Sequence, residues 1–223
     1  YDAENDLVLV SARHKDAIVA VNKEDKSLAW ILGDPTGWDG VDPSYFFTPE
    51  GEDFEWFYAQ HNVSILDNGD IALFDNGTAK VKRVDGDNRV SGDNVYSRAV
   101  VYQIDTENMT VSQVTEYGKE RGADWYSDWI SGVVSLDGTQ DHLWITAGSH
   151  LHSDEENRSD YYPKDMFVQG LTKTTHIDQV DNGELSFELT ISGDTYNALT
   201  YRSFRMPLYT EGKYDPSAVP EVL

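Results

Sequence analysis

The chain has 223 residues, a formal net charge of −23 at pH 7 and no cysteine. This length suits one domain or one large piece of a longer protein, and the 6 Trp and 13 Tyr residues can contribute to a sizeable core. The lack of cysteine excludes disulfides, thiolate catalysis and cysteine-ligated zinc sites. The acidity argues against nucleic acid and anionic membranes as partners, because both repel a negative surface.

Nothing in the sequence indicates a membrane span. No apolar run approaches the ~18 residues that a spanning helix needs. No signal peptide is recognisable ahead of the first predicted strand. We therefore expect the chain to be cut from a longer protein.

Short runs of alternating apolar and polar residues dominate the chain, whereas helical periodicity is nearly absent. This pattern predicts an all-β fold. The predicted strands recur in three similar passes. They cover residues 7–10, 17–21 and 27–33 in the first pass, 69–75, 99–105 and 110–117 in the second, and 142–147, 175–178 and 185–189 in the third.

Repeats of this spacing are typical of β-propellers, whose blades are four-stranded antiparallel sheets. We predict about three blades, over residues 1–55, 56–128 and 129–223, and expect the first blade to lack its innermost strand. All of residues 1–223 would then belong to one portion of a propeller domain. A partial ring leaves edge strands open, which favours self-association.

Two side chains are candidates for chemistry at the mouth of the predicted channel. His61 stands at the head of a predicted inner strand, and Arg13 stands at the end of a strand in the preceding blade. Imidazole can act as a nucleophile or as an acid or base near neutral pH, and guanidinium matches the oxygens of sulfate or phosphate. From the residues alone, a structural histidine and an arginine paired with a carboxylate stay open alternatives.

His150 and His152 form a second candidate site. Side chains two residues apart on a strand face the same side, and histidine is a common metal ligand. The acidic residues that follow equally fit a solvated loop, so a metal-dependent hydrolase is the minor alternative. His142 and His176 fall within predicted strands and are expected to be structural. His14 is expected to point away from its neighbour Arg13 if that strand continues.

Four segments together resemble the arylsulfate sulfotransferase family. They are residues 11–18 (Ser-Ala-Arg-His-Lys-Asp-Ala-Ile), residues 30–38 (Trp-Ile-Leu-Gly-Asp-Pro-Thr-Gly-Trp), Gln60-His61 with residues 74–77 (Phe-Asp-Asn-Gly), and residues 96–100 leading to the heptapeptide Glu-Tyr-Gly-Lys-Glu-Arg-Gly at 116–122. The resemblance is close over most of residues 7–125. Beyond them it consists of blade periodicity and of Tyr-Arg-Ser-Phe-Arg at 201–205.

The resemblance implies the C-terminal part of a six-bladed propeller. Such an enzyme moves a sulfuryl group from an aryl sulfate donor to a phenolic acceptor, without a nucleotide, a cofactor or a metal. His61 matches the histidine that carries the sulfuryl group in a ping-pong reaction. Arg13 matches the arginine that holds the sulfuryl oxygens.

The same resemblance places other catalytic groups outside this chain. A His-x-Asn pair and a further histidine that the family uses would lie upstream of Tyr1, so the chain would hold only part of the active site. The family also implies a periplasmic or extracellular location in a bacterium. The alternative from a different class is a non-catalytic propeller that binds ligands or proteins through its aromatic loops.

Overall fold

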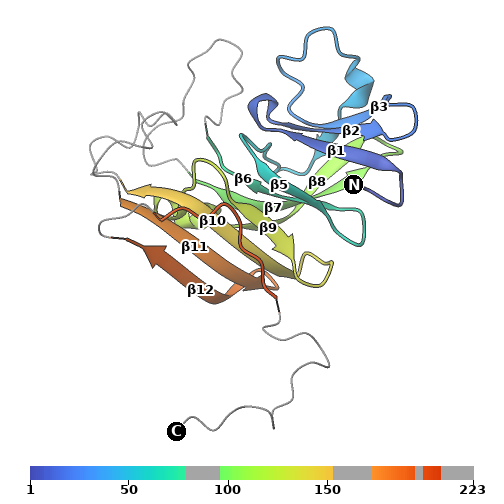
Figure 1. The fold of residues 1–223 in the computed structure, drawn as a ribbon. Helices are drawn as coiled ribbons and strands as arrows, with labels where there is room; N and C mark the ends of the chain where they lie inside the picture. The colour runs from blue at the N-terminus through green and yellow to red at the C-terminus, as the bar shows by residue number, and fades with distance from the viewer. Residues whose placement is uncertain (79–95, 153–171, 194–197, 207–223) are drawn as a thin grey trace, which may run out of the picture.

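The computed structural model describes residues 1–78, 96–152, 172–193 and 198–206, of which residues 150–152, 172 and 173 are described by their backbone alone. These residues form three β-sheets joined by loops and short 3-10 helices (Figure 1). The prediction of an all-β chain is therefore confirmed. Within the described residues, no helix has the length and apolar character needed to cross a membrane.

The first sheet has three antiparallel strands in the order β1-β2-β3. They are β1 (Leu7–Ala12), β2 (Ala17–Asn22) and β3 (Leu28–Gly33). The 3-10 helix η1 (Arg13–Lys15) joins the first two strands. Because β1 ends at Ala12, His14 lies in this turn and is exposed, so the strand alternation expected for it does not apply.

The second sheet has five strands in the order β4-β8-β7-β6-β5, and the short β4 pairs in parallel with β8. The strands are β4 (Thr48–Glu50), β5 (His61–Ile65), β6 (Ile71–Asp75), β7 (Arg98–Asp105) and β8 (Thr110–Tyr117). The 3-10 helix η2 (Pro43–Tyr45) precedes β4, and η3 (Lys119–Trp125) follows β8.

The third sheet has four antiparallel strands in the order β12-β11-β10-β9. The strands are β9 (Gly132–Ser135), β10 (His142–His152), β11 (Thr172–Asp181) and β12 (Glu184–Ser192). Every residue of β12 is exposed, including the apolar side chains of Leu185, Phe187, Leu189 and Ile191.

The second sheet lies between the other two, and its strand β6 packs against both of them. Its side chains alternate between two apolar clusters: Ile71 and Leu73 pack with residues of the first sheet, and Ala72 and Phe74 pack with residues of the third. A strand that is buried on both faces reads as a continuous apolar run. The edge strand β5 contacts β1 on one side and β9 on the other. This stacking places the start of β5, and with it His61, between the neighbouring sheets.

Candidate active site

His61 is the first residue of β5, and the backbone around it is irregular. A β-bulge interrupts the pairing of β5 with β6 between His61 and Ser64. Ala59 and Asn62 both have a φ of 55°, in the left-handed region that non-glycine residues rarely adopt. Bulges and strained residues concentrate where a side chain must be aimed in a particular direction. The local geometry therefore orients His61 away from an ordinary strand position.

The His61 ring is fixed by Asn76, which follows the paired strand β6. The distance from His61 Nδ1 to Asn76 Oδ1 is 2.6 Å. The amide nitrogen of Asn76 donates to the carbonyl oxygens of Ser127 at 2.7 Å and Ile130 at 3.0 Å, which leaves its oxygen as the acceptor. His61 must therefore donate from Nδ1. In the neutral imidazole the lone pair then lies on Nε2.

Asp75 ties together the two chain segments that carry His61 and Asn76. One carboxylate oxygen accepts the backbone N–H groups of Tyr58 at 2.8 Å and Gly77 at 2.9 Å. The other accepts from Arg98 Nε at 2.9 Å. Asp75 and Arg98 are both buried. The Asp75 carboxylate therefore holds the loop before His61 against the turn after Asn76, and Arg98 balances its buried charge.

Arg98 extends the same network from the start of β7. Its guanidinium donates to the backbone oxygens of Glu55 at 3.0 Å and Trp56 at 3.3 Å, and to the carboxylate of Glu116. The sequence predicted a strand from residue 99, and the family motif at 96–100 contained Arg98 without giving it a role. Arg98 is therefore a positioning group that sequence reasoning missed.

Arg13 lies in the η1 turn, which is bonded directly to the segment before His61. Asp16 accepts the N–H of Ala59 at 2.6 Å, and Gln60 Nε2 donates to the Ala17 carbonyl at 2.8 Å. Gln60 is fully buried. Arg13 and His61 are separate in sequence, but these bonds join their supporting segments.

The positive charges near His61 change its acidity. Burial is the main effect that lowers the pKa of His61 below its ordinary value, while the hydrogen bond with Asn76 opposes this change. The charges of Arg13 and Arg202 lower the pKa of His61 further. Near neutral pH the imidazole is therefore uncharged, which is the form that can act as a nucleophile.

A loop before β9 completes the surroundings of Arg13. Arg13 donates to the Asp128 carbonyl at 3.3 Å, and Thr78 donates to the same oxygen at 2.6 Å. The Asp128 carboxylate accepts from Ser149 Oγ at 3.2 Å. Asp128 is buried, and its partners come from distant parts of the chain. Sequence reasoning identified nothing in this loop beyond its aromatic residues.

The distinctive heptapeptide at 116–122 has a structural position. Arg121 donates to Asp178 at 2.8 Å, and Trp125 Nε1 donates to the same oxygen at 3.0 Å. Gly118 has a φ of 105°, and a Cβ there would lie 2.3 Å from the Trp125 ring. Arg121 and Gly118 therefore hold the end of β8 against β11 of the third sheet, whereas Glu116, the first residue of the motif, accepts from Arg98 in the network that supports His61.

His142 and His176 are engaged away from His61. His142 pairs with Asp181 at 2.9 Å on the surface, and His176 lies 3.4 Å from the carboxylate of Glu188. The side chains of His150 and His152 fall outside the described residues. Within the described part of the chain, no three acidic or histidine side chains form a group that could hold a metal ion.

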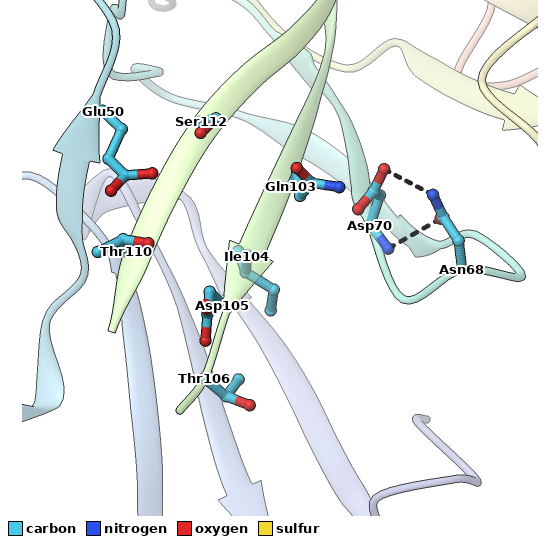
Figure 2. A pocket seen from close by; sticks show the side chains of 9 residues that line it. All are labelled: Glu50, Asn68, Asp70, Gln103, Ile104, Asp105, Thr106, Thr110 and Ser112. Carbon is cyan, nitrogen blue, oxygen red and sulfur yellow. Dashed lines mark hydrogen bonds between the residues drawn. The ribbon is translucent and has the colours of Figure 1, made fainter. Parts of the chain in front are cut away.

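A pocket of about 420 Å³ lies at the opposite end of the β5–β6 hairpin from His61. Figure 2 shows its lining, which includes the carboxylates of Glu50, Asp70 and Asp105. Asn68 donates to Asp70 at 2.8 Å within this lining. Carboxylates would repel an anionic substrate. The pocket is therefore separate from the candidate active site.

Comparison with known proteins agrees with the resemblance in the motifs. The profile of the family described as "Arylsulfotransferase (ASST)" matches residues 1–202. The arylsulfate sulfotransferase AssT of Escherichia coli O6:H1 (strain CFT073) is 31% identical over 221 residues, covering 91% of this chain and 33% of that protein. The AssT of Lelliottia amnigena is 32% identical over 192 residues, covering 76% of this chain and 31% of that protein. The chain thus spans about a third of the length of these relatives, and it belongs to the arylsulfotransferase family.

Proposed function

We propose that the full-length protein moves a sulfuryl group from an aryl sulfate to a phenol, with His61 Nε2 as the nucleophile. The observation that carries this proposal is the hydrogen bond from His61 Nδ1 to Asn76, which leaves the Nε2 lone pair available. The relatives that share the family are named arylsulfate sulfotransferases. This chain would supply part of the active site, with further groups coming from the rest of the protein.

In the first half-reaction, the Nε2 lone pair of His61 attacks sulfur. A nitrogen–sulfur bond forms while the bond from sulfur to the aryl oxygen breaks, and the phenolate leaves with that electron pair and takes up a proton. Charge develops on the terminal sulfuryl oxygens and on the leaving oxygen, so fixed cationic donors lower the barrier. Arg13 is the donor proposed for the sulfuryl oxygens.

In the second half-reaction, the oxygen of the acceptor phenol attacks the same sulfur and gives up its proton. The nitrogen–sulfur bond breaks, and its electron pair returns to His61. Division into two steps lets donor and acceptor use one site in turn. The hydrogen bond to Asn76 keeps the ring in place throughout, because it involves the nitrogen that does not react.

The alternative is a non-catalytic propeller that binds ligands or proteins. We also propose that the full-length protein forms a closed propeller ring. The face-to-face stacking of the three sheets supports this proposal. A periplasmic or extracellular location is proposed from the bacterial relatives.

The test measures transfer from an aryl sulfate to a phenol by the full-length protein, with no nucleotide or metal added. Transfer is expected in the wild type, and His61→Asn should abolish it while the circular dichroism spectrum stays unchanged. His142→Asn, which changes a surface histidine, is the matched control. Full activity in His61→Asn contradicts the nucleophile. Activity that a chelator removes supports a metal enzyme, and no turnover of any aryl sulfate supports the binding protein.

A further inference from the structure

A strap of chain, residues 198–206, lies against the third sheet (Figure 1, red). Two backbone N–H groups of the strap donate hydrogen bonds to β10. The N–H of Thr200 donates to the Gly148 carbonyl at 3.0 Å, and the N–H of Ser203 donates to Thr146 Oγ1 at 3.1 Å. These bonds fix the chain on both sides of residues 201 and 202.

The attachment depends on a glycine. A Cβ on Gly148 would lie 1.8 Å from the carbonyl oxygen of Thr200, which is far inside contact distance. The N–H of Gly148 also donates to Ser131 Oγ at 3.0 Å, and Ser131 Oγ lies 2.8 Å from Ser127 Oγ. The Ser127 carbonyl is one of the two that hold Asn76. The strap is therefore anchored to the same loop that supports the His61–Asn76 pair.

Arg202 is the cation that this strap presents. Its side chain is exposed and lies over the ring of Tyr201, with 5.4 Å from the guanidinium carbon to the ring centroid. The chain has 40 acidic residues, yet no carboxylate among the described residues lies within ion-pair distance of Arg202. By contrast, Arg205 on the same strap donates to Gln179 at 2.6 Å. The backbone on both sides of Arg202 is thus anchored, while the Arg202 side chain is exposed.

Arg13 and Arg202 are carried by the sheets on either side of β5, the strand that begins with His61. Arg13 follows β1 of the first sheet, and Arg202 is carried by β10 of the third. Both charges act on His61, because both contribute to lowering its pKa. In a chain with a net charge of −23, an anion is attracted only where local cations outweigh the overall field.

We propose that Arg202 is a second oxyanion-binding arginine, which holds the terminal sulfuryl oxygens of an aryl sulfate together with Arg13 beside His61. The proposal rests on the proposed function, because it takes the anion to be the sulfuryl group that His61 accepts. A sulfuryl group has three terminal oxygens, and one planar guanidinium can engage two of them. A second guanidinium from the opposite side binds the third and keeps sulfur in front of Nε2.

The test is the binding of inorganic sulfate to the full-length protein, measured by isothermal titration calorimetry. Charge-assisted hydrogen bonds are strong, so Arg202→Gln should weaken sulfate binding about tenfold. Arg205→Gln removes the same charge from the same strap and should stay within about twofold of the wild type, because long-range charge effects are screened by salt. Binding in Arg202→Gln that equals the wild type, or equal weakening in both variants, overturns the proposal. Failure of the wild type to bind sulfate overturns it as well.

Turnover of an aryl sulfate, measured on the same proteins, separates this proposal from the proposed function. Sulfate binding that depends on Arg202 without any turnover supports the oxyanion site and contradicts the sulfotransferase. Turnover that requires His61 but is unchanged in Arg202→Gln, with sulfate binding also unchanged, supports the sulfotransferase and overturns the role of Arg202.

Discussion

His61 and Asn76 face each other across the open end of the β5–β6 hairpin, with 2.6 Å between Nδ1 and Oδ1. Asn76 is fully buried, and its amide nitrogen is engaged by two carbonyl groups of the loop before β9. The second and third sheets therefore both determine how the imidazole is oriented. This relationship connects the acidity of His61 to a fully buried side chain on the neighbouring strand end.

Asn76→Asp should move the pH dependence of transfer. The variant keeps an acceptor oxygen but adds a negative charge beside the ring, which raises the pKa of His61. The acidic limb of the profile of kcat/KM against pH should therefore shift to higher pH. Asn68→Asp adds the same charge at the far end of the hairpin and should leave the profile in place. Superimposable profiles for Asn76→Asp and the wild type would contradict a role for this contact.

The strands were predictable because their signal is local. Alternation with a period of two identifies β2 or β8 from a few residues, and the Gln-His pair marked the start of β5 correctly. The bonds that build the site are not local. Asn76 and Ser127 are 51 residues apart, and no periodicity shows that two such residues meet. Asp128, Arg98 and Arg202 went unassigned for the same reason.

Arg98→Met should destabilise the chain strongly. The substitution keeps an unbranched side chain of similar length but leaves the Asp75 carboxylate buried without its cation. Breaking a buried ion pair in this way costs roughly 3–5 kcal/mol of unfolding free energy. Urea denaturation followed by tryptophan fluorescence measures the change.

Lys119→Met is the control for this experiment. Lys119 pairs with Glu55 at 2.7 Å, but 36% of its side chain is exposed. An exposed ion pair contributes about 0–1 kcal/mol, so this variant should remain close to the wild type. Equal losses of unfolding free energy in Arg98→Met and Lys119→Met would show that Arg98 contributes no more than an exposed charge.

Self-association of the isolated chain remains a prediction, and β12 is where the structure favours it. Leu185, Phe187, Leu189 and Ile191 are each more than 40% exposed on this edge strand. Unpaired edges with apolar side chains invite pairing with another copy. The charge of −23 opposes association, so added salt should increase it by screening the repulsion. Sedimentation velocity at low and high salt measures the mass, and a monomer under both conditions would contradict the prediction.

Asp178 should make stability depend on pH in the acidic range. Burial raises the pKa of Asp178 to about 6, although the nearby guanidinium of Arg121 opposes this change. The folded chain then binds a proton more tightly than the unfolded chain, whose aspartate titrates near 4. The resulting stabilisation is complete below pH ~4 and is lost as the pH rises through about 6, an effect of roughly 2–3 kcal/mol.

Asp178→Asn removes this titration, because the amide stays neutral at every pH while its oxygen can still accept from Trp125 and Tyr117. Unfolding free energies measured between pH 4 and 7 should therefore fall with rising pH more steeply in the wild type than in the variant. Asp105→Asn, at an exposed turn where hydrogen bonds lower the pKa of the aspartate, is the control and should leave the slope between pH 4 and 7 nearly unchanged. The stabilisation from this carboxylate is present above pH ~4 and is lost only on further acidification, below the measured range. Parallel curves for the wild type and Asp178→Asn would mean that Asp178 is ionised across the whole range, with Arg121 outweighing its burial.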